Sequence, residues 1–203
     1  MMNALAINRG TSGNVSARID HGFLVTPSAL DYDKTRPEDI VAIDIADNTI
    51  GRRSPSSEWR FHRDIYAART EVDAIVHTHA PFATTIACLD RGIPPFHYMV
   101  AAAGGTDIRC APYATFGTQS LSDAAVRALE GRRACLLAHH GMIAVGASLD
   151  AALALAVEVE TLAQMYWQAL AVGEPRLLDE AEMREVVERF AGYRPQIAHD
   201  RER

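Results

Sequence analysis

The stretch Ala74-Ile75-Val76-His77-Thr78-His79-Ala80-Pro81 carries the strongest fold and site signal in this chain. β-Favouring apolar residues run into a His-x-His pair and stop at a proline, which predicts a buried strand that ends in a loop. Because side chains alternate across a strand, His77 and His79 are expected on one face, roughly 6.6–7 Å apart along it. A bend at the strand end would bring both imidazoles onto one ion. The stretch therefore predicts a metal site, with two histidines satisfied by neighbours or water as the alternative.

A second apolar run also ends in histidine: Ala134-Cys135-Leu136-Leu137-Ala138-His139-His140-Gly141. It predicts another buried strand. Consecutive strand residues face opposite ways, so at most one of His139 and His140 is expected to join the first pair. A site with three histidines keeps one or two metal positions open for substrate, which is typical of catalytic rather than structural zinc.

Composition excludes several classes of protein. The 203 residues carry a formal net charge of −6 with acidic and basic residues interspersed, which indicates neither nucleic-acid nor membrane-surface binding. No signal peptide and no bilayer-spanning stretch is recognised, and three cysteines without a C-x-x-C favour neither a disulfide framework nor a thiolate zinc site. We expect a single globular domain over residues 1–203, located in the cytoplasm.

The lysine content limits the chemistry. Lys34 is the only lysine among 20 basic residues, and it lies in the polar turn Asp31-Tyr32-Asp33-Lys34-Thr35-Arg36-Pro37. Schiff-base catalysis needs a lysine that is neutral near neutral pH, and an exposed turn does not lower the pKa of its amine. Carbonyl chemistry in this chain is therefore expected to use a metal.

Two polar segments are candidates for anion binding. The glycines of Asn8-Arg9-Gly10-Thr11-Ser12-Gly13-Asn14 let backbone N–H groups approach an anion, although an ordinary turn is the alternative. Ser54-Pro55-Ser56-Ser57-Glu58-Trp59 predicts a helix start with capping serines and an early proline. Glu58 is then either an acid that favours the helix dipole or a general base, and these two interpretations stay open. Ser56 and Ser57 add hydroxyl groups for a phosphate.

Hydrophobic periodicity predicts the remaining helices. They cover residues 82–89, 122–129 and 151–172, with a last helix capped by Asp179. The helix over residues 151–172 is apolar on most of its circumference and is expected to be largely buried. Together with the small residues 101–105, it offers more buriable surface than one domain needs, which indicates an oligomer.

Several motifs occur together and in order along the chain. They are Gly-Thr-Ser-Gly-Asn (10–14), Pro-Ser-Ser-Glu-Trp-Arg-Phe-His (55–62), His-x-His (77–79), Ile-Pro-x-x-His-Tyr-Met (93–99), Ala-Pro-Tyr-Ala-Thr-Phe-Gly-Thr (111–118) and His-His-Gly (139–141). In this set the chain resembles the class II aldolase/adducin family over residues 6–193. One loop alone would be a weak signal, whereas the full set is very specific.

The resemblance implies a three-layer α/β/α fold with a central, largely antiparallel sheet, assembled as a four-fold cyclic homotetramer. It implies one zinc ion per subunit, with ligands Glu58, His77, His79 and His140, so that His140 rather than His139 is the ligand of its motif. It also implies that Glu58 and Tyr98 are catalytic. The residues that it implies for binding the substrate and its phosphate are Gly13, Asn14, Ser28, Ser56, Ser57, Phe116 and Tyr193. Tyr98 and Tyr193 match family tyrosines that reach the site of a neighbouring subunit.

The activity that this resemblance implies is reversible cleavage of a ketose 1-phosphate to dihydroxyacetone phosphate and a small aldehyde. The substrate would be L-fuculose 1-phosphate or a related deoxy or methylthio ketose phosphate. Sugar-phosphate 4-epimerases and methylthioribulose-1-phosphate dehydratases of the same family are alternatives, although the epimerases typically carry Asp-Thr where Glu58-Trp59 stands. A non-catalytic, adducin-like interaction module is a third alternative, but such modules lack the histidine set.

Two departures from the family pattern bear on the site. Ala29 stands where the family usually has glycine in the second phosphate turn, and a positive φ there would be expected to shift or weaken the phosphate contact. The N-terminal helix of the family is expected to be mostly absent, which would leave some sheet surface less covered.

Overall fold

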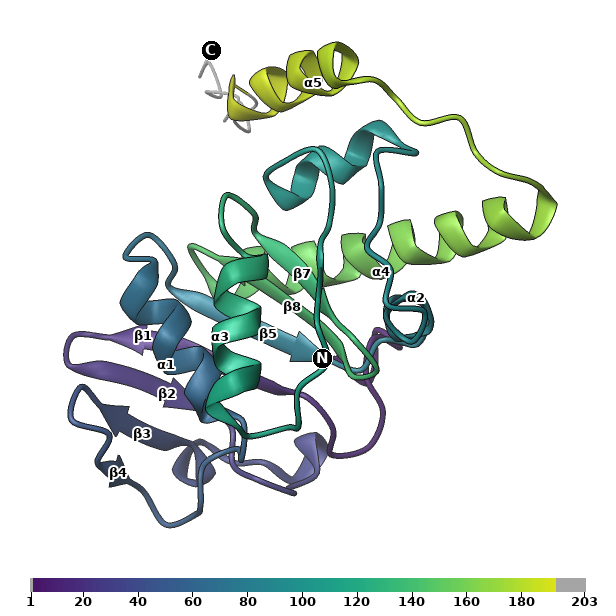
Figure 1. The fold of residues 1–203 in the computed structure, drawn as a ribbon. Helices are drawn as coiled ribbons and strands as arrows, with labels where there is room; N and C mark the ends of the chain where they lie inside the picture. The colour runs from purple at the N-terminus through teal and green to yellow at the C-terminus, as the bar shows by residue number, and fades with distance from the viewer. Residues whose placement is uncertain (1, 193–203) are drawn as a thin grey trace, which may run out of the picture.

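The computed structural model describes residues 2–192, which form one eight-stranded sheet between two layers of helices (Figure 1). The strand order is β4-β3-β2-β1-β5-β8-β7-β6, and neighbouring strands are antiparallel except for the pair β6 and β7. The strands are β1 Asn14–Ile19, β2 Gly22–Val25, β3 Val41–Asp44, β4 Thr49–Ile50, β5 Ala74–Thr78, β6 Cys110–Ala111, β7 Ala134–Leu137 and β8 Gly141–Gly146.

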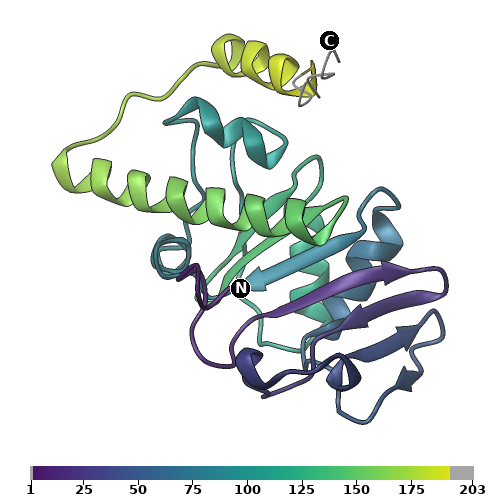
Figure 2. The same cartoon turned by 180° about the vertical axis from the view of Figure 1, so that it is seen from behind.

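The helices cover both faces of this sheet. Helices α1 (Trp59–Ala68) and α3 (Gln119–Ala128) pack on one face, and α2 (Pro81–Ala87) and α4 (Leu149–Val172) pack on the other (Figures 1 and 2). Helix α5 (Glu180–Gly192) packs against the 3₁₀ helix η3 (Tyr98–Ala103) beyond α4. Two further 3₁₀ turns are η1 (Tyr32–Lys34) and η2 (Pro37–Asp39). The expected three-layer α/β/α arrangement with a largely antiparallel sheet is confirmed.

Each face of the sheet has its own hydrophobic core, and strand β5 contributes to both. Ala74 and Val76 pack into the cluster under α2 and α4, whereas Ile75 packs into the cluster under α1 and α3. All five residues of β5 are buried, which explains why its sequence is an unbroken apolar run up to the histidines. Its place between β1 and β8 puts His77 in the middle of the sheet.

Helix boundaries agree with the sequence predictions to within a few residues, but the structure differs from the sequence analysis at three points. Strand β8 was not predicted: the expected strand ended at the histidines, whereas the chain turns back over only three residues, 138–140, into a further strand. Helix α1 begins at Trp59, later than its serines suggested. The small residues Ala101–Ala103 are buried in the core of this same chain, so they provide no spare surface for an oligomer.

The long helix α4 is buried less completely than expected. One stripe of it packs on the sheet, while Trp167 and Val172 are exposed toward its C-terminal end. Among the described residues, no helix combines the length and the apolar character that crossing a membrane requires.

Candidate active site and metal centre

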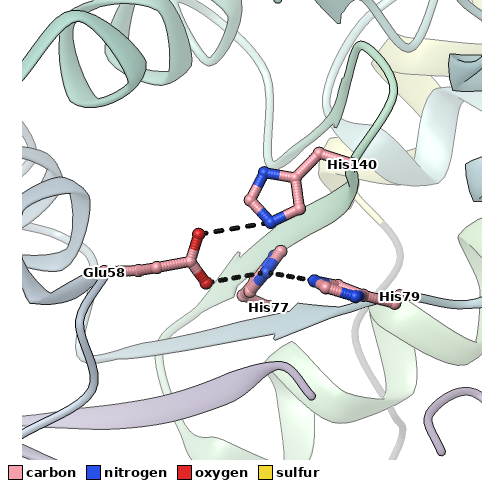
Figure 3. A group of neighbouring side chains, drawn as sticks. All are labelled: Glu58, His77, His79 and His140. Carbon is pink, nitrogen blue, oxygen red and sulfur yellow. Dashed lines mark hydrogen bonds and ion pairs between the residues drawn. The ribbon is translucent and has the colours of Figure 1, made fainter. Parts of the chain in front are cut away.

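Three histidines and one carboxylate converge near the end of β5 (Figure 3). One side-chain nitrogen or oxygen from each of Glu58, His77, His79 and His140 lies within 4.8 Å of the corresponding atoms of the other three. Nε2 of His77 is 3.2 Å from Nε2 of His79 and 3.2 Å from Oε2 of Glu58. Nε2 of His140 is 3.2 Å from Oε1 of Glu58. The structure thus brings together the whole predicted ligand set.

Antiparallel pairing of β5 with β8 fixes the ring of His77. His77 lies opposite Ile143 in the ladder, and its Nδ1 donates a hydrogen bond to the carbonyl oxygen of Met142 at 2.9 Å. A backbone carbonyl only accepts hydrogen bonds, so Nδ1 carries the hydrogen and Nε2 presents its lone pair to the cluster. The strand partner thereby selects the form of the imidazole that binds metals.

The turn between β7 and β8 separates the two adjacent histidines. His139 adopts a left-handed conformation with φ +55°, and its exposed ring lies beside Asp90, with Nε2 3.4 Å from Oδ2. His140 is therefore the member of the pair that joins His77 and His79, as the family resemblance implied. Because side chains alternate along a strand, at most one of the two histidines could join the cluster. The left-handed conformation of His139 in the turn makes His140 that residue.

The backbone of Glu58 sits just before helix α1, but its side chain does not serve the helix. Glu58 occupies the N-cap position with φ −102° and ψ +13°, and its carboxylate caps no backbone N–H group. The carboxylate instead faces the histidines. Burial raises the pKa of the Glu58 carboxyl, but the positive charge that His77 and His140 carry when protonated outweighs burial and lowers that pKa below its ordinary value. The geometry thus favours a site role for Glu58 over a helix-dipole role.

The donor set fits a divalent metal ion. Burial, together with the neighbouring rings of His77 and His140, lowers the pKa of His79 to about 4, so this imidazole is neutral at neutral pH. Two nitrogen lone pairs 3.2 Å apart repel each other unless a cation lies between them. Tetrahedral zinc with nitrogen ligands at 2.0–2.1 Å spaces neighbouring ligand atoms by about 3.3 Å. Oε1 of Glu58, which is buried and accepts no hydrogen bond within the described part of the chain, is a further ligand atom.

A cavity of about 310 Å³ opens in front of these ligands. Its lining includes Glu58, His79 and His140, and most of the residues predicted to bind substrate lie there too: Gly13, Asn14, Ser28, Ser56, Ser57 and Phe116. Tyr98 does not line the cavity; it is 51% exposed and borders a groove with Arg189 and Phe190. Tyr193 lies outside the described residues. Lys34 is not part of the lining, and its side chain is 77% exposed.

The first polar turn approaches the metal ligands very closely. Gly13 has φ +69°, and a Cβ atom at this position would lie 2.5 Å from the carbonyl oxygen of His77, so only glycine fits. The side chain of Asn14 is buried, donates through Nδ2 to Oε2 of Glu58 at 3.0 Å, and uses its Oδ1 for His62. Its amide is therefore engaged with the carboxylate rather than free toward the cavity.

The second phosphate turn, which contains Ser28 and Ala29, also borders the cavity. Ala29 lines the cavity with φ +54°, the left-handed conformation that glycine adopts without strain. Ala29 is thus held in a strained backbone conformation. We expect Ala29→Gly to raise the free energy of unfolding by about 0.5–1 kcal/mol, because relief of the strain exceeds the added entropy of the unfolded chain. Urea unfolding measures this, and kcat/KM should change little.

Ala154→Gly is the matched control for Ala29→Gly. Ala154 is an exposed residue inside helix α4, where glycine costs about 1 kcal/mol relative to alanine. The same substitution should therefore have opposite signs at the two positions. A loss of stability at both positions would show that Ala29 is not strained.

Sequence reasoning missed two buried polar residues that support the site. Asn8 accepts a hydrogen bond from the backbone N–H group of His79 at 3.4 Å and donates to the carbonyl oxygen of Ser12 at 2.6 Å. His62, which is fully buried, holds the amide of Asn14. His62 is the last residue of the motif at residues 55–62, four residues after Glu58. That spacing of one helical turn could have indicated that the two side chains lie on the same side of the helix.

The fold and the donor set define an α/β protein with a candidate metal centre of three histidines and one carboxylate. Comparisons with known proteins identify the family within this class. Residues 1–167 match the family model "Class II Aldolase and Adducin N-terminal domain". The chain belongs to the class II aldolase and adducin family.

Relatives and solved structures agree with this assignment. The chain is 59% identical over 189 residues to a 5-methylthioribulose-1-phosphate/5-deoxyribulose-1-phosphate aldolase of Rhodospirillum rubrum, covering 93% of this chain and 86% of the relative. It is 48% identical over 193 residues to the L-fuculose phosphate aldolase of Escherichia coli strain K12, covering 95% and 90%. A solved L-fuculose 1-phosphate aldolase superposes with a TM-score of 0.91 at 41% identity, covering 94% of this chain and 91% of that chain.

Proposed function

We propose that this chain is a zinc-dependent class II aldolase that reversibly cleaves a ketose 1-phosphate to dihydroxyacetone phosphate and a small aldehyde. One observation carries the proposal. The ionised Glu58 carboxylate lies 3.2 Å from Nε2 of both His77 and His140, on the wall of a cavity bordered by hydroxyl-rich turns. A metal centre, an acid–base group and an anion site thus adjoin one another.

The chemistry divides among these groups. A divalent ion held by the three histidines would supply a Lewis acid for the ketose carbonyl and its neighbouring hydroxyl. In the cleavage direction the C4 hydroxyl loses its proton, the C3–C4 bond breaks, and C3 gains a proton to give dihydroxyacetone phosphate. Glu58 is placed to deliver the proton to C3, and Tyr98 is assigned to the C4 oxygen. Zinc is favoured as the ion because imidazole and carboxylate ligands in this number suit a catalytic zinc site.

The phosphate is assigned to the turns that border the cavity. Gly13 lies in the first turn, Ser28 in the second, and Ser56 and Ser57 precede Glu58. Backbone amides and hydroxyl groups bind phosphate without a lysine, which fits a chain whose one lysine lies elsewhere. Asn14 contributes through Glu58 rather than through its own amide.

The aldehyde part is proposed to carry a deoxy or methylthio tail. Tyr113 and Phe116 line the cavity and are 62% and 65% exposed, so their rings offer apolar surface to a substrate tail. The relative at 59% identity is named for 5-methylthioribulose 1-phosphate and 5-deoxyribulose 1-phosphate. We therefore rank these two ketose phosphates ahead of L-fuculose 1-phosphate for this chain.

An assay of product formation tests the function. The purified zinc-loaded protein is incubated with each of the three ketose 1-phosphates, and dihydroxyacetone phosphate is measured with a coupled dehydrogenase. We expect release from all three, with the highest kcat/KM for the deoxy or methylthio substrates. A C4-epimeric product would indicate the epimerase alternative, and loss of water would indicate the dehydratase. If none of the three substrates is turned over, the non-catalytic, adducin-like interaction module is the alternative that remains.

We also propose a cytoplasmic homotetramer with active sites at the subunit interfaces. Cys88, Cys110 and Cys135 are free thiols, which suits a reducing compartment. Tyr98 is the residue that supports the shared site, because it is exposed on η3 and does not line the cavity of its own chain. Trp167 and Val172 on α4 add exposed apolar surface for a subunit contact.

Mixing two inactive variants tests the shared site. Chains carrying Glu58→Gln or Tyr98→Phe are each expected to be nearly inactive, but co-assembled rings contain sites with an intact Glu58 and a neighbour's intact Tyr98. Random mixing of equal amounts in a cyclic ring should restore about a quarter of the wild-type activity. Properly mixed oligomers without recovered activity, or a fully active monomer on sizing, would contradict the shared site.

A further inference from the structure

A continuous line of buried hydrogen bonds runs from the interior of the α1 layer to the Glu58 carboxylate. Tyr66 Oη is 2.8 Å from Ser16 Oγ, and Ser16 Oγ is 2.6 Å from Nδ1 of His62. Nε2 of His62 is 2.5 Å from Oδ1 of Asn14, whose Nδ2 is 3.0 Å from Oε2 of Glu58. All five side chains are buried.

Each bond in this line has a defined direction. The Glu58 carboxylate only accepts hydrogen bonds, so the amide nitrogen of Asn14 faces it and the amide oxygen faces His62. That oxygen also only accepts, so Nε2 of His62 carries the hydrogen. Burial lowers the pKa of His62 to about 3, so the ring is neutral and Nδ1 accepts a hydrogen bond from Ser16. The hydroxyl of Tyr66 then donates to Ser16.

Packing holds the His62 ring in the orientation that this direction needs. The ring stacks on Phe61 with centroids 4.6 Å apart and lies parallel to Phe23 at 6.4 Å. His62 is fully buried, so bulk water does not reach either nitrogen. Without the Nε2–H group, the amide of Asn14 would have a buried, unpaired oxygen. The amide would then be held only through its bond to Glu58 and would lose its fixed direction.

We propose that His62 is a positioning residue for Glu58: its Nε2–H group locks the amide of Asn14, and the amide nitrogen in turn aims the carboxylate at the histidine cluster. An amide held at both ends keeps a direction but does not pass a proton on. The line therefore orients Glu58 and is not a proton path. This inference deepens the proposed aldolase function and rests on it for its kinetic consequence, but the hydrogen-bond direction stands by itself.

A matched pair of amide variants separates the two contacts of His62. In His62→Gln the amide nitrogen reaches the position of Nε2 and can donate to Asn14. In His62→Asn the shorter amide reaches only the position of Nδ1, so it keeps Ser16 and loses Asn14. We expect kcat of the zinc enzyme to fall about 10- to 100-fold in His62→Asn with KM little changed, and His62→Gln to recover most of the loss.

Two further measurements do not depend on turnover. ¹⁵N NMR of the wild-type zinc protein should show the His62 imidazole as the neutral Nε2–H form. The visible absorption spectrum of the Co²⁺-loaded protein should be the same in wild type and His62→Gln and shifted in His62→Asn, because the Glu58 carboxylate is displaced. Thermal unfolding of both variants controls for folding.

The outcomes are distinct. An Nδ1–H form of His62, or equal kcat and equal Co²⁺ spectra in the two variants at matched stability, would overturn the positioning role. Absence of ketose-phosphate cleavage in wild type would overturn the proposed function alone, since the tautomer and the Co²⁺ spectra would still decide the role of His62.

Discussion

His77→Ala is expected to abolish metal binding and to lower aldolase activity roughly 1000-fold or more, because the Lewis acid contributes several kcal/mol to the transition state. His77 is completely buried, and its Nε2 lies 3.2 Å from both His79 and Glu58. Its Nδ1 is already bonded to Met142, so no other nitrogen of this ring is available. The measurement is the zinc content by atomic emission after dialysis, together with dihydroxyacetone phosphate release.

His139→Ala is the control for this experiment. His139 neighbours a ligand in sequence, but its ring lies beside Asp90 and outside the cluster. The variant should retain most of the zinc that His77→Ala loses, and His140→Ala should lose it as His77→Ala does. Zinc loss in His139→Ala with full retention in His140→Ala would reverse the ligand assignment.

Glu58→Gln is expected to lower kcat roughly 100-fold or more, the usual scale for a general acid–base group. The amide has nearly the shape of the carboxylate but neither its charge nor its ability to take up and deliver a proton. The three imidazoles remain, so the variant should still bind zinc and the substrate phosphate. Turnover is measured by product release, zinc by emission, and binding by titration with dihydroxyacetone phosphate.

Near-normal turnover in Glu58→Gln would show that Glu58 is not the acid–base group and only favours the positive end of the α1 dipole. Loss of zinc equal to that of His77→Ala would instead make Glu58 chiefly a ligand. The structure argues against the first outcome, because the carboxylate caps no amide of α1 and faces His77 and His140.

Much of the fold was predictable from local pattern. The apolar run before His77 indicated a strand buried on both faces, and β5 is that strand. Asp179 was predicted to cap the last helix, and its Oδ1 accepts hydrogen bonds from the backbone N–H groups of Ala181 and Glu182. Such features depend on residues within one or two turns of each other, so sequence alone encodes them.

The sequence by itself indicated that His77 and His79 share a face and that at most one of His139 and His140 joins them. Only the tertiary structure decided between His139 and His140, because the choice depends on a left-handed residue in the turn between β7 and β8. It alone showed Glu58 facing the histidines and the amide of Asn14 engaged by His62. These contacts join different elements of the fold, and the one from Asn14 to Glu58 spans 44 residues of sequence. Periodicity sets the direction of a side chain on its own element, whereas the packing of elements sets what that side chain meets.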